Sequence, residues 1–445
     1  MLILSPVHRR RTSAAAVLAI LLLLVACKKN EQTPTTTPPA TTITSLSSQI
    51  LNAGDPLLLR GKALGTDASI VAIQLDTIVL KVDRCQDSLV AVTLPPASQL
   101  HYYGSRTLTL SVTINGKTRY TNTYNLTVKC PEPKGWFDLY RGNGVLNYVG
   151  FESACISLAF ADDTIGYMHY KDNLLKTTDG GLSWQHPDFH YGNALCMSVF
   201  DTATVWSGDL GFVNITRDGA RSWTNHRLPA GLNDLIIGQY MTGATTGLIA
   251  GAAGRIYRVA GASFDTTSEF TQDYQSKWAG SSLVWGSLSA VDADNLLLGG
   301  VGTDKTVFPA VYRPLVAVKT NGVYDEYLLP SGVTAATGLT QVQMIYNALG
   351  FAVTSDNDLL KYTGNRTWTV LPQKATAALF TDELTGYAAY NEKIYKSTDG
   401  GQTWSPVWSL RSGDVVINFT TRNGRLWAIG NNQTAGGWFI EKYNP

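Results

Sequence analysis

Hydrophobic and polar residues alternate with a period of two through much of residues 43–130. The alternation is clearest at residues 70–75, 88–94 and 107–114, and it is typical of β-strands with one buried face. Asn115 and Gly116 follow the last of these segments, and this dipeptide favours a two-residue hairpin turn. About 90 residues of short strands and polar turns predict a β-sandwich of immunoglobulin-like size.

After residue 136 the pattern becomes a repeat of short apolar runs that end in a turn and a tryptophan. The turn reads Thr-Thr-Asp-Gly-Gly-Leu-Ser-Trp at 177–184, Thr-Arg-Asp-Gly-Ala-Arg-Ser-Trp at 216–223 and Ser-Thr-Asp-Gly-Gly-Gln-Thr-Trp at 397–404. A weaker copy at 361–368 keeps the glycine, threonine and tryptophan but has no aspartate. The copies lie 39 residues apart from Trp184 to Trp223 and 36 apart from Trp368 to Trp404, which is the length of a four-stranded propeller blade.

Weaker units at about 234–269, 284–330 and 413–445 bring the number of blades to about seven. Residues 136–140 precede the first full unit and have no blade of their own. We predict that they form the outer strand of the last blade, because a ring closed in this way leaves no exposed strand edges. The predicted fold is all-β: an immunoglobulin-like β-sandwich followed by a seven-bladed β-propeller.

The first residues have the parts of an export signal, a basic segment at 8–11 and a short apolar segment at 14–26. Cys27 ends the sequence Leu-Val-Ala-Cys, which resembles the lipobox of bacterial lipoproteins, in which the cysteine takes the lipid. The alternative is an N-terminal anchor helix with a chance cysteine. A Thr- and Pro-rich stretch then favours an extended stalk. The predicted organisation is signal peptide 1–26, stalk 27–42, sandwich 43–130, linker 131–135 and propeller 136–445.

The charge balance excludes some classes of partner. The 445 residues include 35 Lys and Arg and 34 Asp and Glu, for a net charge of +1, whereas nucleic-acid binding needs a clustered basic excess. No nucleic-acid partner is therefore expected. No cofactor is predicted either. Export to an oxidising space makes two disulfides arithmetically possible, Cys85 with Cys130 and Cys155 with Cys196. The alternative is four small buried side chains.

The repeated turn resembles the Asp-box, also called the BNR repeat, whose role is structural. We expect the carboxylates of Asp179, Asp218 and Asp399 to accept hydrogen bonds from turn N–H groups. Gly181 and Gly401 permit a positive φ, and an indole packs beneath each turn. These indoles belong to Trp184, Trp223, Trp368 and Trp404.

Two further resemblances concern whole segments. The pattern around the Asp-box turns resembles most closely the propeller family that includes photosystem II assembly factors, and more distantly sialidases and sortilin-type receptors. Residues 43–65, with Ile-Thr-Ser-Leu, Ala-Gly-Asp and Gly-Lys-Ala-Leu-Gly, resemble the IPT/TIG immunoglobulin-like family. Members of that family most often serve as spacers.

A catalytic site is not expected. Sialidases need three arginines in an Arg-Ile-Pro setting, a Tyr and Glu pair and an acidic Asp, and Tyr312-Arg313-Pro314 matches that setting poorly. His186, Asp188 and His190 are metal-ligand types, but their spacing matches no familiar zinc pattern, so no metal site is predicted.

Recognition is expected where the repeat is interrupted, because irregular loops on a rigid scaffold commonly carry binding sites. Tyr274 and Trp278 lie in one such interruption, and residues 303–327 form another. The alternative is that both aromatic rings are packed between adjacent blades.

The sequence therefore predicts a monomeric lipoprotein of the Gram-negative cell envelope, held at the outer membrane by its N-terminal lipid. Lys28 and Lys29 after Cys27 resemble the residues of lipoproteins sent to that membrane. The propeller is expected to recognise a polysaccharide or a partner envelope protein without catalysis. Two alternatives are a factor that holds another membrane protein during assembly and a glycan hydrolase.

Overall fold

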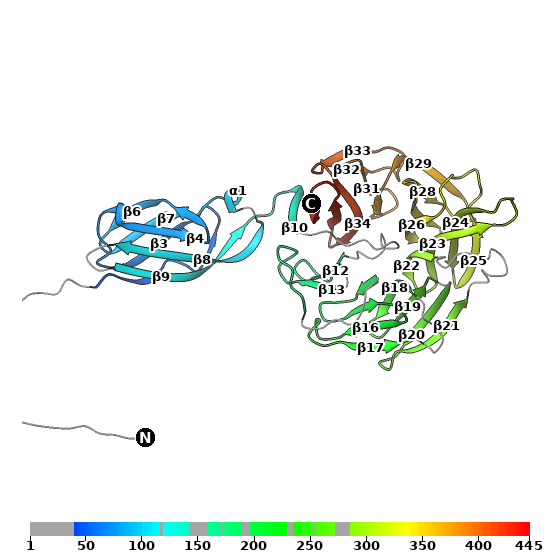
Figure 1. Cartoon of the computed structure of the whole chain (residues 1–445), viewed down its shortest axis with the longest axis horizontal. Coiled ribbons are helices and arrows are strands. Elements are labelled where there is room, and N and C mark those ends of the chain that lie inside the picture. The colour runs from blue at the N-terminus through cyan, green and yellow to red at the C-terminus, as the bar shows by residue number, and fades with distance from the viewer. Residues whose placement is uncertain are drawn as a thin grey trace, which may run out of the picture.

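The computed structural model divides into two groups of β-sheets joined by a short linker (Figure 1). It describes residues 40–100, 102–115, 119–142, 158–170, 173–187, 196–228, 235–252, 254–271 and 285–445. The predicted signal peptide and Cys27 therefore lie outside the described residues. Among the helices that the structure does describe, none has the length and apolar character needed to cross a membrane.

The first group is a sandwich of two sheets. One sheet has the strand order β1 (Thr42–Leu46), β3 (Pro56–Lys62), β7 (Leu89–Thr93) and β6 (Val82–Gln86). The other has the order β2 (Ile50–Asn52), β9 (Arg119–Cys130), β8 (Gly104–Asn115), β4 (Val71–Leu75) and β5 (Ile78–Leu80). A 3-10 helix (Ala68–Ile70) and α1 (Ala97–Leu100) complete this group.

Alternating side chains of the two sheets form one core. Leu57 and Leu59 of β3 and Ile73 of β4 are completely buried in it. The alternation at 70–75, 88–94 and 107–114 corresponds to β4, β7 and β8. Strands β8 and β9 pair as an antiparallel hairpin up to Asn115 and Arg119. The predicted hairpin is confirmed, but the predicted two-residue turn is wrong, because Asn115 is itself paired and three residues separate it from Arg119.

Of the two alternatives for Cys85 and Cys130, the disulfide is wrong, because both residues are free thiols. Cys85 lies on β6, the edge strand of one sheet, whereas Cys130 is the last residue of β9 in the other sheet. Burial raises the pKa of both thiols. Cys196 begins β14, and Cys155 lies outside the described residues, so the second pair stays a prediction.

The second group is a ring of seven sheets, counted over the described residues, and each sheet is termed a blade (Figure 1). Blade 1 contains β11 (Leu158–Phe160), β12 (Gly166–Tyr170) and β13 (Asn173–Thr177). Blade 2 contains β14 (Cys196–Val199), β15 (Val205–Gly208), β16 (Phe212–Thr216) and β17 (Thr224–Arg227). Blade 3 contains β18 (Ile236–Gly243), β19 (Thr246–Gly251), β20 (Arg255–Ala260) and β21 (Asp265–Thr271).

The remaining blades follow the same plan. Blade 4 contains β22 (Trp285–Asp292), β23 (Asn295–Asp304), β24 (Val311–Thr320) and β25 (Val323–Leu328). Blade 5 contains β26 (Leu339–Tyr346), β27 (Leu349–Thr354), β28 (Asp358–Tyr362) and β29 (Trp368–Lys374). Blade 6 contains β30 (Ala377–Phe380), β31 (Gly386–Tyr390), β32 (Lys393–Ser397) and β33 (Ser405–Ser409). Blade 7 contains β34 (Asp414–Arg422), β35 (Arg425–Asn432), β36 (Trp438–Asn444) and β10 (Gly135–Gly142).

The ring closes through its first strand. β10 pairs antiparallel with β36, from Gly135 opposite Asn444 to Gly142 opposite Trp438. The first strand of each blade packs against that of the next, and β34 of the last blade packs against β11 of the first. The prediction that residues 136–140 form the outer strand of the last blade is confirmed.

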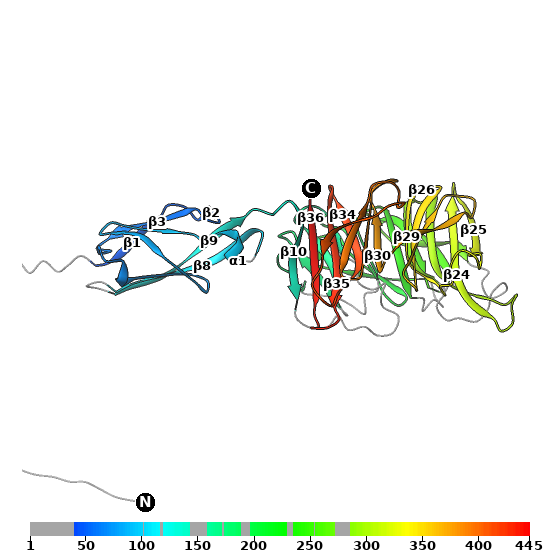
Figure 2. The same ribbon diagram turned by 90° about the horizontal axis from the view of Figure 1, so that it is seen from above.

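The expectation of an irregular insert at 303–327 is wrong for most of its length. β24 and β25 occupy most of it, and short turns at residues 305–310 and 321–322 join the strands. The hairpin of β23 and β24 extends beyond the rest of its sheet. β22 pairs with β23 only as far as Gly300. β23 and β24 continue to pair with each other, from Val301 opposite Pro314 to Asp304 opposite Val311. Figure 2 shows this ribbon reaching out at the end of the ring farthest from the sandwich.

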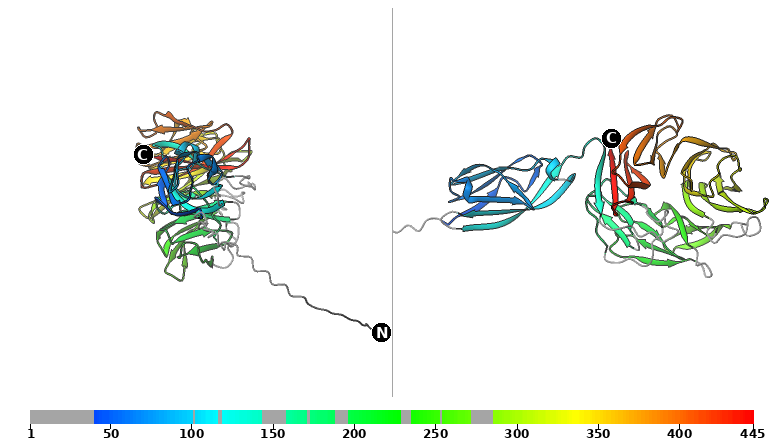
Figure 3. Two further views of the ribbon diagram at one scale, coloured as in Figure 1. Left: turned by 90° about the vertical axis from the view of Figure 1, so that its left-hand side faces the viewer. Right: turned by 45° about the horizontal axis from the view of Figure 1, so that its top comes forward.

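The sandwich lies on the side of the ring where β10 closes it (Figure 3), and described side chains of the two groups are in contact near blades 7 and 1. The ring of Tyr103 meets that of Phe137 edge-on with 4.7 Å between centroids. Leu182 packs against both cores. Beside this apolar contact, Glu132 of the linker accepts a hydrogen bond of 2.6 Å from the buried Nζ of Lys442.

Candidate binding site at the mouth of the ring

The ring has two rims with different contents. Because neighbouring strands in each blade are antiparallel, the turns between first and second strands and between third and fourth strands lie on one rim. The turns between second and third strands, and the connections from one blade to the next, lie on the other. We call these the Asp-box rim and the mouth rim.

A hollow opens on the mouth rim between blades 5, 6 and 7. It consists of two adjoining parts of about 600 and 490 Å³, which share Thr376, Val415 and Gln433. The larger part is lined by Thr340, Gln341, Thr354, Ser355, Asn357, Thr376, Val415, Ile417, Asn431, Asn432, Gln433, Gly436 and Gly437. The smaller is lined by Thr376, Ala389, Tyr390, Asn391, Glu392, Leu410, Gly413, Asp414, Val415, Val416, Gln433 and Thr434.

The lining is mostly uncharged, with hydroxyl and amide side chains next to short apolar ones. The whole wall of the larger part carries no ionisable side chain. The amide Oδ1 of Asn431 is buried there and accepts no hydrogen bond from the described residues. Such a surface presents donors and acceptors to a neutral polar ligand, such as a peptide backbone or sugar hydroxyls.

Side chains that bridge blades hold the inner strands around this hollow. The amide of Gln341 donates to Ala378 O at 2.9 Å and accepts from Ala378 N at 3.0 Å, so blade 5 is bonded to blade 6. Gln343 makes the same pair of bonds with Phe380. Thr376 Oγ1 donates to Val416 O of blade 7 at 2.8 Å. The walls are therefore fixed before any ligand arrives, which lowers the entropic cost of binding.

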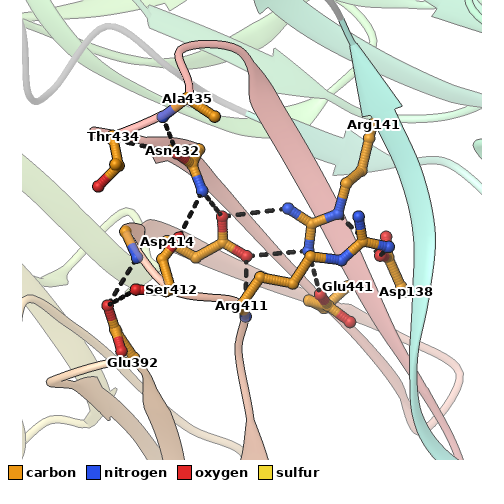
Figure 4. Close-up of polar contacts among 11 residues, drawn as sticks. Asp138, Arg141, Glu392, Arg411, Ser412, Asp414, Asn432, Thr434, Ala435 and Glu441 are labelled. Atoms are coloured by element: carbon orange, nitrogen blue, oxygen red, sulfur yellow. Dashed lines mark hydrogen bonds and ion pairs between the residues drawn. The ribbon is translucent and has the colours of Figure 1, made fainter.

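The two acidic residues of the hollow are already engaged (Figure 4). Asp414 is completely buried and accepts a bidentate pair from Arg141, at 3.1 Å to Oδ1 and 2.9 Å to Oδ2. Asn432 Nδ2 donates to the same carboxylate at 2.8 Å. Glu392 Oε1 accepts from Gly413 N at 2.6 Å. Asp414 is therefore tied to the closing strand, and Glu392 is tied to the backbone of the loop before β34.

Arg141 joins the closing strand to the last blade. Its Nε donates to Asp138 at 2.7 Å and its Nη2 to the buried Glu441 at 3.1 Å, besides its bonds to Asp414. Arg411 also donates to Asp138. Burial raises the pKa of Glu441 to about 8, and the negative charge of Asp138 adds to the shift. Burial lowers the pKa of Arg141, but hydrogen bonds to Asp414 and Asp138 outweigh it and the net shift is upward.

The predicted Asp-box residues lie on the opposite rim and hold turns together. Asp399 Oδ1 accepts from the backbone N–H groups of Gln402 and Thr403, each at 2.9 Å, and Oδ2 accepts from Thr403 Oγ1. Asp179 and Asp218 accept the equivalent bonds from Ser183 and Ser222. Hydrogen bonds from Ser222 lower the pKa of Asp218 to about 2, and those from Thr403 do the same for Asp399.

The glycines and tryptophans of the motif complete these turns. Gly181 and Gly401 have φ of +98° and +90°, a conformation that disfavours other residues. The indoles of Trp184 and Trp404 donate to the carbonyl oxygens of these glycines at 3.1 and 2.9 Å. Trp223 packs in the core beneath the second copy.

The weaker copy forms a different turn. Thr367 N donates to Gly364 O at 2.8 Å around Asn365 and Arg366, whose φ angles are both positive, so this is a tight hairpin turn. Trp368 then begins β29, and its indole donates to Tyr327 of blade 4 at 3.0 Å. The copy that lacks the aspartate therefore has no Asp-box turn. Its tryptophan bonds to the neighbouring blade instead.

Several candidate residues lie outside the described ranges: Tyr274, Trp278, Asp188, His190 and Cys155. Of the metal-ligand candidates only His186 is described. The described part of the chain contains no group of three or more His, Cys, Asp or Glu side chains placed to hold a metal ion. The residues of the hollow were missed by sequence reasoning. Aligning the repeats would place their turns on one rim, but hydroxyl and amide side chains in turns are too common to stand out.

No protein-family model and no curated protein matches this sequence. Among solved structures, YCF48 bound to D1 peptide is similar with a TM-score of 0.54 and 14% identity, over 71% of this chain and 98% of that chain. The ring is a β-propeller. YCF48 from Cyanidioschyzon merolae is similar with a TM-score of 0.51 and 16% identity, over 70% of this chain and 99% of that chain.

The similarity to the YCF48 structures shows the fold of the propeller alone, since the identities are so low. An auxiliary nutrient binding protein from Bacteroides thetaiotaomicron VPI-5482 covers 91% of this chain and 98% of its own, at 11% identity. Its TM-score is 0.41.

Proposed function

We propose that this chain is a non-catalytic binding protein of the bacterial cell envelope, and that its propeller holds an extended segment of a partner protein in the hollow on the mouth rim. The hollow itself is the observation that carries the proposal. Its larger part offers about 600 Å³ of space between hydroxyl and amide groups, without an ionisable side chain. An extended peptide presents N–H and C=O groups at every residue, and such walls can satisfy them.

The fold comparison supports this choice of ligand. The similar propeller YCF48 was solved bound to D1 peptide, and this supports a peptide as the ligand of the present propeller. The sandwich contacts the propeller near the Asp-box turn of blade 1, through Leu182. The mouth rim is therefore left accessible on the described surface. A role in holding an envelope protein during its assembly is one form of this function.

A glycan is the second candidate ligand. The hydroxyl and amide lining suits sugar hydroxyls, and Tyr390 is one aromatic side chain of the smaller part on which a sugar ring could stack. A glycan hydrolase is not proposed, because Asp414 and Glu392 are held in hydrogen bonds within the wall.

The envelope location rests on the sequence. The lipobox-like sequence at Cys27 supports a lipid anchor at the outer membrane, and the Thr- and Pro-rich residues 28–42 support a stalk. The likeness of residues 43–65 to IPT/TIG domains supports an immunoglobulin-like spacer. We propose that the sandwich holds the propeller away from the anchor.

A substitution that fills the hollow tests the function. Gln433 is exposed and belongs to both parts of the hollow, so Gln433→Trp should occupy the space with an indole while leaving the buried core intact. A photo-reactive residue at the same position in living cells identifies the protein that lies there. Binding of the crosslinked segment, measured by calorimetry with the purified full chain, should weaken by roughly tenfold or more in Gln433→Trp.

The matched control is Leu384→Trp, which adds an indole to an exposed position on the Asp-box rim. It should leave binding unchanged. If a glycan array with the same chain shows binding that Gln433→Trp abolishes, the ligand is a sugar. Equal crosslinking from positions 433 and 384 would contradict a site in the hollow.

A further inference from the structure

The tip of the β23–β24 ribbon carries exposed apolar side chains that no part of the described fold uses. Phe308 is fully exposed, and Val307, Val311 and Tyr312 are 45%, 42% and 53% exposed. No other stretch of the described residues carries four large exposed apolar side chains so close together in sequence. Single exposed apolar residues are normal on proteins, but a cluster of this kind marks a contact surface.

The ribbon is built to hold this tip in place. Asp304 is almost completely buried at its base, and its carboxylate accepts from Thr306 N at 2.9 Å and from the guanidinium of Arg313. The same guanidinium donates to Leu329 O, which ties the base to blade 4. The backbone ladder continues to Asp304 and Val311, directly below the tip. A fixed base means that little conformational entropy is lost when the tip makes contact.

The exposed apolar side chains lie on both faces of the tip, and this indicates what kind of environment the tip contacts. Val311 and Tyr312 are neighbours on one strand, so their side chains point to opposite faces of the ribbon, yet both are exposed. A ribbon that lay along the surface of another protein would be apolar on one face only. A tip that is apolar on both faces suits a medium that surrounds it.

The residues on either side of the tip fit an apolar medium that is bordered by water. Residues 307–311, Val-Phe-Pro-Ala-Val, contain no charged or polar side chain. Lys305, directly after β23, and Tyr312 on β24 lie on the two sides of this run. Lysine and tyrosine side chains bury their apolar parts while their polar ends stay with water and lipid head groups.

We propose that the tip of the β23–β24 ribbon is a membrane-contacting element that enters the interfacial region of a lipid bilayer. The tip inserts Phe308 and Val307 among the upper parts of the acyl chains, within about 5–10 Å of the head groups. Contact at this depth leaves the rest of blade 4 in water. The β23–β24 turn connects the second and third strands of its blade, so the tip stands on the same rim as the hollow.

A local probe at the tip tests this proposal on the full chain. Phe308→p-acetylphenylalanine keeps an aromatic ring and accepts a nitroxide label. With vesicles of phosphatidylethanolamine and phosphatidylglycerol, the label should gain accessibility to oxygen and lose accessibility to an aqueous nickel chelate by roughly tenfold. Phe308 packs against nothing in the described fold, so the near-ultraviolet circular dichroism should not change.

The matched control is Val323→p-acetylphenylalanine, which is 71% exposed in the same blade but lies on the Asp-box rim. Its label should stay in water with or without vesicles. A label at 308 that remains equally accessible to nickel when vesicles are added overturns the proposal. So does protection without vesicles that grows with protein concentration, because a second copy of the chain then covers the tip. Neither outcome depends on what the hollow binds.

Discussion

At the scale of single residues, one of the three complete Asp-box turns departs from the others at the second glycine position. Gly181 and Gly401 occupy it in blades 1 and 6, and Ala220 occupies it in blade 2 with φ of +69°. A left-handed conformation costs a residue with a Cβ about 1–2 kcal/mol relative to glycine. The second copy therefore keeps its aspartate and serine bonds and tolerates a strained backbone.

This difference predicts opposite effects for two reciprocal substitutions. Ala220→Gly should raise the free energy of unfolding by about 0.5–1 kcal/mol, because it relieves the strain and loses only one small buried methyl group. Gly401→Ala should lower it by about 1–2 kcal/mol, since an added Cβ would also lie 2.6 Å from Leu371 Cδ1. Denaturant unfolding of both variants measures these changes. Equal destabilisation by both would contradict the role assigned to the backbone angle.

At the scale of elements, the closing strand β10 depends on a buried charged cluster. Asp138, Asp414 and Glu441 surround Arg141, and Arg411 reaches Asp138 from outside (Figure 4). Asp414 and Glu441 are buried beside Arg141. Burial, together with the negative charge of Asp138, raises the pKa of Glu441 to about 8, against 4.5 for an ordinary glutamate.

The sign of the pH dependence follows from that shift. Between pH 4.5 and 8 the folded chain holds a proton on Glu441 that the unfolded chain releases. The contribution of this group to the free energy of unfolding is therefore full below pH 4.5 and falls as pH rises to 8. The slope is at most about 1.4 kcal/mol per pH unit.

Glu441→Gln fixes the neutral form and should remove this dependence. The free energy of unfolding of the variant and of the natural chain should be measured at several pH values from 5 to 9. The stability of the variant relative to the natural chain should increase as pH rises. Other ionisable groups titrate in both proteins and cancel in the comparison. A constant difference between them would show that Glu441 is ionised throughout.

The elements were largely predictable, because each blade repeats a spacing that the sequence displays. Even the weak units at 234–269 and 413–445 correspond to blades 3 and 7. The insert at 303–327 was misjudged because a lengthened hairpin interrupts the repeat without interrupting the sheet. The charged cluster had no local signal, since Arg141 and Asp414 are 273 residues apart and meet only through the register of β10. The hollow arises in the same way, from turns of three different blades.

At the scale of the whole molecule, the contact between sandwich and propeller uses the variable position of one Asp-box. Leu182, Arg221 and Gln402 occupy that position in the three complete copies. Only Leu182 is apolar, and it packs against both the sandwich core and the propeller core. An added Cβ at Gly104 would lie 2.7 Å from it, so the sandwich backbone approaches Leu182 closely. A structural turn thus also serves as a docking point.

This arrangement predicts that Leu182→Ser frees the sandwich at a modest cost to the propeller. The Asp-box bonds of Asp179 do not involve the Leu182 side chain, but its apolar contact with the propeller core is lost, so the free energy of unfolding of the ring should fall by about 1–2 kcal/mol. Spin labels at the exposed positions Val79 and Val323 report the separation of the two parts, and their distance distribution should broaden in Leu182→Ser. Gln402→Ser alters the matched position of blade 6 and should leave it unchanged. An unaltered distribution in Leu182→Ser would assign the docking to Tyr103 and to the Glu132–Lys442 ion pair instead.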